Sequence, residues 1–435
     1  MAPSHISALM SGVMLKIAVY GLIRFSFDLL SDMSWAWGLT LLLMGTASTL
    51  LGVLYALMQH DLKRLLAYHS VENIGIIFMG LGLSMIFIGT GHTNLGVLGL
   101  LAGLYHTVNH ALFKSLLFLG AGSILQQTHE RDIEHLGGLI RRMPKTAVIF
   151  LIGCISISAL PPFNGFVSEW LTFQTALQVS TLESGVLRSL IPITAAMLAL
   201  SGALAAACFV KVYGVTFLGQ PRTRHASHAH EIPHLGMHAG PALLAALCAL
   251  FGILPTPVLS VLEQIPKQLL GQGLPGASRS GWLWLTPVAP EVASYAAPLV
   301  LLGILLAWGL AYALLHPHGQ SLRRDRPWDC GSGPLTARMQ YTSASFSMPL
   351  RRIFRPIWQI QEVTEIETEG VQGLRVTGIR YHLAIADHLW SVFYEPIAAG
   401  VQTAARQVAR IQTGSLRTYL AYSFLTLVIL LWLIT

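Results

Sequence analysis

The stretch LGVLGLLAGLYHTVNHALFKSLLFLGAGSIL, residues 95–125, decides the fold of this protein. It is apolar over a length that exceeds the roughly 20 residues an α-helix needs to cross a bilayer. His106, His110 and Lys114 follow one another at intervals of four residues. A helix places such residues on one face, here over roughly 12 Å. Because a charge at the bilayer centre costs roughly 2.5–3.5 kcal/mol, three protonatable groups on one face indicate a proton path.

Two other interpretations of this triad stay open. The polar side chains could form a seam between packed helices without moving protons. Histidines at positions i and i+4 can also bind zinc, although a third ligand would have to come from elsewhere in the chain. The reference pKa of histidine, about 6.5, suits a proton relay, and we therefore favour the relay.

Composition identifies the broad class of protein. Hydrophobic residues make up 53% of the chain, charged residues 11%, and the mean hydropathy is +0.60. Such a chain cannot cover itself with polar side chains, so we predict an all-α, multi-pass membrane protein in contact with the lipid bilayer. The net charge of +7 does not indicate nucleic acid, because the basic residues follow membrane topology. The four cysteines are far apart and form no CxxC, and we expect no metal and no cofactor on this chain.

We predict nine membrane helices. With alternating helices, eleven lysines and arginines fall on one side and three or four on the other. This positive-inside bias predicts that the N-terminus and residues 317–413 are cytoplasmic. The predicted helices cover residues 4–30, 34–59, 70–90, 95–126, 147–175, 190–218, 238–262, 294–316 and 414–434.

The fifth of these helices is interrupted by Pro161, Pro162 and Gly165. Prolines remove backbone hydrogen bonds, which is tolerated at membrane depth only where protein or water covers the break. Transporters place such broken helices at ion sites. A simple structural kink is the alternative, but Glu169, just beyond the break, favours an ion site.

Three further positions hold polar side chains in or beside predicted helices. Lys16 lies in the middle of the first helix, where a proton-carrying role is favoured over snorkelling to the interface. Lys211 lies near the cytoplasmic end of its helix, so snorkelling is favoured and a proton role is the alternative. Glu72 and Asn73 are predicted to start the third helix, where capping and anchoring at the membrane face explain them.

The segment 317–413 differs from the rest in composition. Within it, residues 382–411 are predicted to form an amphipathic helix, with apolar positions at Leu383, Ile385, Leu389, Phe393 and Ile397. This helix could lie on the membrane surface, on a partner subunit or against its own bundle.

Five segments carry a resemblance to a known family. They are SALMSGVMLKIAVYGLIRF from Ser7, DLKRLLAYHSVENIG from Asp61, YHTVNHALFKSLLFLGAGSI from Tyr105, HLGGLIRRMP from His135 and SALPPFNGFVSEW from Ser158. Together they resemble the antiporter-like membrane subunits of respiratory complex I and its relatives. The segment RPWDCGSGPLTARMQYTSASFSMP, from Arg326, resembles the large membrane subunit of group 4 hydrogenases, the hydrogenase-4 and formate hydrogenlyase type.

The resemblance implies a fold of two inverted five-helix repeats. Residues 34–218 would form one whole repeat within a proton-translocating core at 1–262. Residues 263–316 would add a membrane helix, 317–413 an interfacial segment and 414–435 a last membrane helix. About seven family helices would precede Pro3, so we expect either a short form or another chain that supplies the first half.

Residue roles follow from the same resemblance. Lys16 is similar to the lysine that links the two half-channels, and His106, His110 and Lys114 resemble the central relay. Glu169 takes the terminal position, where some relatives carry lysine. The expected function is proton translocation in the membrane arm of a bacterial inner-membrane complex. Its partners would be other membrane subunits and a peripheral module with Ni–Fe and iron–sulfur centres. A sodium/proton antiporter subunit and a non-pumping scaffold remain alternatives.

Overall fold

The computed structural model describes residues 2–30, 33–274, 281–288, 294–316, 328, 330–331, 333, 335–357, 359–369, 375–386 and 390–434. Two compact units make up the chain, Met1–Pro349 and Leu350–Thr435. The first holds the helix bundle, and the second holds a β-hairpin and two helices.

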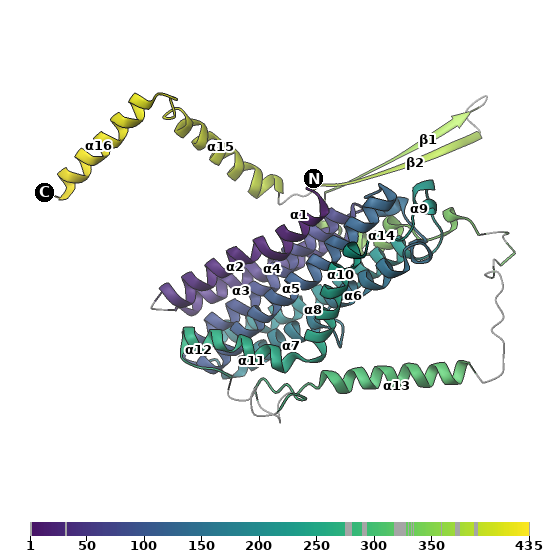
Figure 1. Ribbon diagram of the computed structural model, residues 1–435, viewed down its shortest axis with the longest axis horizontal. Coiled ribbons are helices and arrows are strands. Elements are labelled where there is room, and N and C mark those ends of the chain that lie inside the picture. The colour runs from purple at the N-terminus through teal and green to yellow at the C-terminus, as the bar shows by residue number, and fades with distance from the viewer. Residues whose placement is uncertain are drawn as a thin grey trace. The chain divides into compact units, whose positions relative to one another are not determined.

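The first unit is a bundle built around one long helix, α5 (Figure 1). This helix, Thr93–Thr128, contains the apolar stretch at 95–125 and packs against α1, α4, α6, α7 and α10. The other helices are α1 (Ser4–Leu9), α2 (Leu15–Ile23), α3 (Trp35–Leu57), α4 (Leu62–Gly89), α6 (Pro144–Ile157), α7 (Asn164–Leu177), α8 (Gly185–Phe217), α9 (Arg224–His228), α10 (Leu235–Ile253), α11 (Pro255–Leu262), α12 (Gln264–Leu270), α13 (Ala297–Leu315) and α14 (Ser343–Ile353), which crosses into the second unit.

Among the described residues, eight helices are long and apolar enough to cross a membrane. They correspond to eight of the nine predicted spans, and the all-α membrane fold is confirmed. The remaining predicted span, the fifth in chain order at 147–175, is divided into α6 and α7, each of which is shorter than a membrane span. The first span, Ser4–Leu29, is continuous but contains two π-helical segments, Met10–Met14 and Arg24–Leu29.

The predicted start of the third helix at residue 70 is wrong. Helix α4 begins at Leu62, because the side chain of Asp61 caps it by accepting a hydrogen bond from the backbone N–H of Arg64 at 3.0 Å. Glycines then let α4 pack closely on α3: a Cβ at Gly45 would lie 2.7 Å from the carbonyl oxygen of Gly75. The earlier start places Glu72 and Asn73 inside the bundle.

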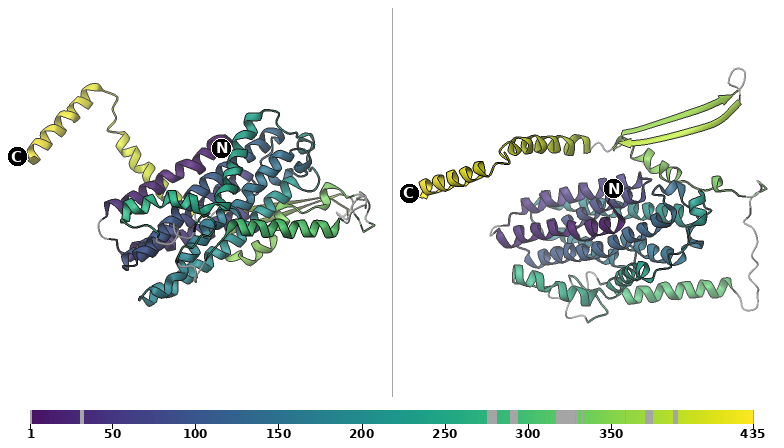
Figure 2. Two further views of the ribbon diagram at one scale, coloured as in Figure 1. Left: turned by 60° about the horizontal axis from the view of Figure 1, so that its bottom comes forward. Right: turned by 45° about the horizontal axis from the view of Figure 1, so that its top comes forward.

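The second unit begins with an antiparallel hairpin of β1 (Gln359–Glu369) and β2 (Arg375–Ala386), which Figure 2 shows as a long ribbon. Ile366 pairs with Ile379, and the register is interrupted between Glu367 and Thr368. Two helices follow, α15 (Glu395–Ala409) and α16 (Leu416–Ile434).

The predicted amphipathic helix at 382–411 is therefore wrong over its first part. Leu383 and Ile385 belong to β2, and Leu389 lies outside the described residues. β1 contains the β-branched residues Val363, Thr364 and Ile366, which favour a strand. Because β1 pairs with β2, residues up to Ala386 are extended and not helical. The remainder of the prediction agrees with α15, which contains Ile397.

Candidate proton-transfer site

Helix α5 carries the three side chains of the predicted relay. His106, His110 and Lys114 have exposed fractions of 1%, 0% and 0%. Each turns to a different neighbour: His106 to α4 and α7, His110 to Lys16, and Lys114 to the backbone of α4. Helix α5 therefore acts as the axis from which polar contacts reach the surrounding helices.

Lys16 contacts the relay directly. Its Nζ lies 2.9 Å from Nδ1 of His110 and donates to the carbonyl oxygen of Ser11 at 2.6 Å. Ser11 lies in the π-helical segment Met10–Met14, where the helical hydrogen bonds are irregular. An ammonium can only donate, so a charged Lys16 requires Nδ1 of His110 to accept. A proton can pass between these two nitrogens without an intervening group.

His106 bridges two other helices. Its Nε2 lies 3.2 Å from Oδ1 of Asn73, and its Nδ1 lies 2.9 Å from Oγ of Ser168. An amide oxygen only accepts, so Nε2 carries the hydrogen and Nδ1 accepts from the serine hydroxyl. Ser168 directly precedes Glu169 on α7, so His106 contacts the helix that carries the predicted terminal carboxylate.

Glu72 and Asn73 lie in this network and not at a helix start. The exposed fraction of each is 2%. Glu72 accepts hydrogen bonds from His69 Nδ1, from Asn73 Nδ2 at 3.4 Å and from Ser201 Oγ at 3.1 Å. The interpretation as cap and membrane-face anchor is wrong.

His69, Glu72 and Asn73 were not recognised as one cluster in the sequence. Their spacing of three and four residues within an apolar helix is the same signal that singled out the triad on α5. The predicted start of the helix at residue 70 separated His69 from the other two and concealed the pattern.

Lys114 and Glu169 complete the set. The ammonium of Lys114 donates to the carbonyl oxygen of Leu66 and lies close enough to Glu72 for mutual attraction. Glu169, with an exposed fraction of 6%, makes no hydrogen bond to the described part of the chain and lies within repulsive range of Glu72. A Cβ at Gly202 would be 3.6 Å from Oε2 of Glu169, so this glycine leaves room beside the carboxylate.

The break between α6 and α7 is covered by α5. Asn109 donates to the carbonyl oxygen of Asn164 at 2.8 Å, and Asn164 Nδ2 donates back to Asn109 Oδ1 at 3.2 Å. Gly165 is needed for close approach, because a Cβ there would lie 1.9 Å from the carbonyl oxygen of Ser156. Protein groups of α5 thus cover the start of α7 at the break.

Lys211 does not snorkel. Its exposed fraction is 1%, and its Nζ donates to the carbonyl oxygens of Leu57 at 2.6 Å and Gln59 at 3.1 Å. The predicted position near the membrane face is compatible with these contacts, but the ammonium points into the protein. Buried carbonyls take the place of water around it.

In the described part of the chain, no group of three or more His, Cys, Asp or Glu side chains is placed to hold a metal ion. The buried polar side chains of α4, α5, α7 and α8 instead form hydrogen bonds in which donors face acceptors. Such an arrangement can hold a proton at several nitrogens and oxygens and pass it between helices.

The fold and the site define a polytopic membrane protein with a buried row of protonatable side chains. The family described as NADH:quinone oxidoreductase/Mrp antiporter, TM, matches residues 1–198. Hydrogenase-4 component B of Escherichia coli (strain K12) is 39% identical over 99% of this chain and 64% of its own length. Formate hydrogenlyase subunit 3 of the same strain is 38% identical over 83% of this chain and 57% of its own length.

Among solved structures, the membrane-bound sulfane sulfur reductase, an archaeal respiratory membrane complex, contains a chain with the same fold. The TM-score is 0.67 at 24% identity, over 98% of this chain and 62% of that chain. Residues 1–198 therefore belong to the NADH:quinone oxidoreductase/Mrp antiporter family of membrane subunits, and nearly the whole chain is similar to hydrogenase-4 component B. The chain spans less than two thirds of the length of both curated relatives.

Proposed function

We propose that this chain conducts protons in the membrane arm of a hydrogenase complex of the hydrogenase-4 or formate hydrogenlyase type, in a bacterial cytoplasmic membrane. The contact that carries this proposal is Lys16 Nζ at 2.9 Å from His110 Nδ1. A basic amine directly on a buried imidazole has no packing rationale, since apolar side chains of similar volume would avoid the desolvation cost. The names of the two curated relatives support the assignment to a hydrogenase.

The proposed proton row contains Lys16, His110, His106, Lys114 and Glu169. Residues 1–262 form the translocating core around this row. Glu72 and Asn73 extend it, because together they connect His106 with His69. Glu72 also lies close to Lys114. A change of charge at one member alters the proton affinity of its neighbours, and a proton loaded at one end can drive release at the other.

The partners are assigned by the same reasoning. The chain would bind other membrane subunits and transmit energy from a peripheral module whose Ni–Fe and iron–sulfur centres lie on other chains. The chain's own contribution is to hold and pass protons. Hydrogen evolution itself would then continue when the row is interrupted, while charge separation would not.

Lys114→Met tests this function in proteoliposomes that contain the whole complex. We expect membrane-potential generation per hydrogen evolved to fall by about tenfold or more, because removal of a buried charge partner costs several kcal/mol. Lys145→Met is the matched control, since Lys145 is an exposed lysine at the start of α6. An unchanged potential in Lys114→Met would leave a scaffold role. Activity that requires sodium in the buffer would indicate sodium as the transported ion.

A further inference from the structure

Helix α8 carries a polar stripe that the proposed row does not use. Ser201, Cys208 and Lys211 are spaced by seven and three residues, which puts them on one helix face. Ser201 donates to Glu72, and the ring of Phe209 packs on His69 with ring centres 4.6 Å apart. Residues later in α8 therefore contact residues earlier in α4. The stripe leads from Glu72 past His69 toward the beginning of α4.

His69 presents a free acceptor to this stripe. Its Nδ1 faces the carboxylate of Glu72 and must carry the hydrogen, so Nε2 has a bare lone pair. This Nε2 is buried and has no hydrogen-bond partner in the described residues. The thiol of Cys208, itself fully buried, lies close to His69, Lys114 and Lys211. Cys208 is thus a thiol that lies within reach of His69 and of both lysines.

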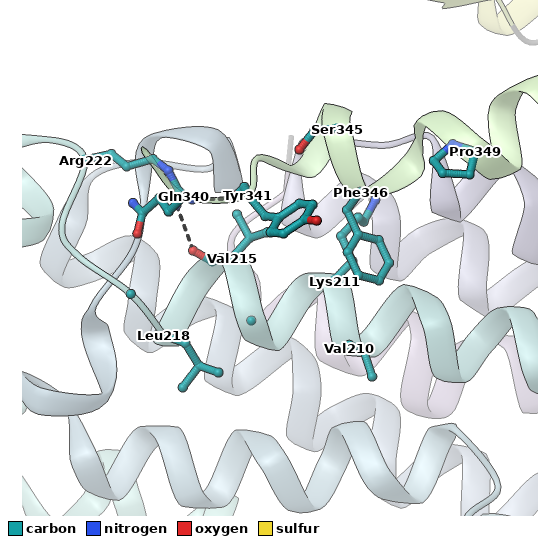
Figure 3. A pocket seen from close by; sticks show the side chains of 12 residues that line it. Val210, Lys211, Val215, Leu218, Arg222, Gln340, Tyr341, Ser345, Phe346 and Pro349 are labelled. Atoms are coloured by element: carbon teal, nitrogen blue, oxygen red, sulfur yellow. Dashed lines mark hydrogen bonds between the residues drawn. The ribbon is translucent and has the colours of Figure 1, made fainter. Parts of the chain in front are cut away.

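Lys211 lies where this stripe meets the membrane face, under a strap. We define the strap as residues 335–349, which include the first part of α14. Ser347 of the strap donates at 2.9 Å to the Leu57 carbonyl oxygen that also accepts from Lys211. A cavity of about 450 Å³ separates the strap from α8, with Phe346 and Pro349 on one wall and Lys211 and Val215 on the other (Figure 3). The strap closes Lys211 from the solution.

Polar contacts near the surface hold the strap. The amide of Gln340 accepts from Gln220 N and donates to Gln220 O, both at 2.9 Å. Arg222 donates to the carbonyl oxygen of Tyr341 at 2.7 Å. Glu134 accepts from the backbone N–H of Ala344 at 2.7 Å. The hydrogen bonds of Gln340 and Arg222 are exposed and open at low free-energy cost, so this end of the strap can lift without unfolding the bundle.

We infer that Lys211, Cys208 and His69 form a branch of the proton row, and that the strap is the lid over its outer end. When the strap lifts, the neutral Lys211 amine takes a proton from solution. An N–H bond of Lys211 then breaks as an S–H bond forms at Cys208, and the proton already on sulfur forms the new N–H bond at His69 Nε2. His69 becomes an imidazolium beside the Glu72 carboxylate, and no group gains or loses electrons. This branch rests on the proposed function, since it delivers protons to the same row.

The lid is tested with Gln340→Ala in membranes that contain the complete complex. Reaction of Cys208 with a small membrane-permeant maleimide is followed at peptide resolution. Losing the two Gln340 hydrogen bonds should raise the open population, and the labelling rate, by about tenfold. Cys248, buried on α10, is the internal control. Equal labelling of Cys208 in the variant and in the parent protein overturns the lid, as does a parallel rise at Cys248.

The branch is tested with Lys211→Arg and Lys211→Met. Arginine keeps the charge and donors but does not release a proton. If Lys211 transfers protons, both variants should lose about tenfold in potential generated per hydrogen evolved. Normal coupling in Lys211→Arg shows a purely structural lysine and overturns the branch. The proposed function is tested separately by Lys114→Met. If Lys114→Met loses membrane potential per hydrogen evolved while Lys211→Arg keeps the parent's value, only the branch is refuted.

Discussion

At the scale of the residue, the interior of this bundle is organised by shared acceptors. The Glu72 carboxylate accepts hydrogen bonds from His69 and Asn73 of α4 and from Ser201 of α8. An ionised carboxylate can accept several hydrogen bonds at once, and each charge-assisted bond offsets part of its desolvation. Glu72 is therefore both the electrostatic centre of the site and the point where α4 and α8 meet.

Glu72→Gln separates these two contributions. The amide keeps the shape and one acceptor oxygen but removes the charge, so His69 loses the partner that stabilises its imidazolium form. We expect proton-coupled potential to fall about tenfold to a hundredfold, as a charge-assisted hydrogen bond of about 1.5–3 kcal/mol is lost.

Assembly of the Glu72→Gln complex is checked by the yield of purified complex, which should be near that of the parent. Glu183→Gln is the control, because Glu183 is an exposed residue in the loop before α8. Equal loss in both variants, or none in Glu72→Gln, would contradict a role for this carboxylate in coupling.

At the scale of the element, irregular backbone occurs beside the protonatable side chains. The π-helical segment Met10–Met14 adjoins Lys16, and the break between α6 and α7 is followed by Glu169. In both places a backbone carbonyl beside the irregularity, that of Ser11 or Asn164, accepts a side-chain hydrogen bond. Backbone carbonyls beside the irregular segments thus act as acceptors for polar side chains in an apolar interior.

Gly165→Ala tests the close approach that the break requires. A Cβ at this position would lie 1.9 Å from a backbone oxygen of α6, so α6 and α7 must move apart. We expect a loss of about 1–3 kcal/mol in stability, the usual range for overpacking. The midpoint of thermal unfolding in detergent measures it.

The matched control for this substitution is Gly185→Ala at the start of α8. A Cβ there meets nothing within 4 Å, and alanine is the better helix former. Its thermal midpoint should equal or exceed that of the parent. A Gly165→Ala protein as stable as Gly185→Ala would show that the contact with α6 is not tight.

At the scale of the whole bundle unit, Glu134 ties three distant segments together. It lies in the loop after α5, with His60 Nδ1 3.5 Å from Oε1, and it accepts from the first turn of α14. Burial acts to raise the pKa of Glu134, but the nearby His60 and the backbone N–H groups of Ala344 and Ser343 outweigh it and hold the pKa below its usual 4.5.

This lowered pKa predicts a pH dependence of stability. A carboxyl whose folded pKa is depressed contributes stability above about pH 4.5, and that contribution is lost as the pH falls through the folded value. Glu134→Gln should therefore lower the thermal midpoint at neutral pH. In acid, where the parent's own carboxyl is protonated, the two midpoints should converge. A difference that stays constant with pH would mean that the charge of Glu134 does not stabilise the fold.

Much of this protein follows from the sequence alone. Apolar length and loop charge predicted the spans, because a bilayer imposes helix length directly on the chain. The regular spacing of His106, His110 and Lys114 predicted their common face, because helix geometry is local. The prolines near residue 161 predicted the break for the same reason. The assignment of these residues to proton transfer stays a prediction.

Only the tertiary structure showed which side chains from other helices contact the row on α5. Helix α4 contributes His69 and Glu72, and α8 contributes Lys211, through contacts between residues far apart in the chain. A capping aspartate moved the start of α4, and strand β2 extends to Ala386, into the first residues of the helix predicted at 382–411. Periodicity shows which face of a helix is polar, but the partner that satisfies a buried charge depends on how the helices pack.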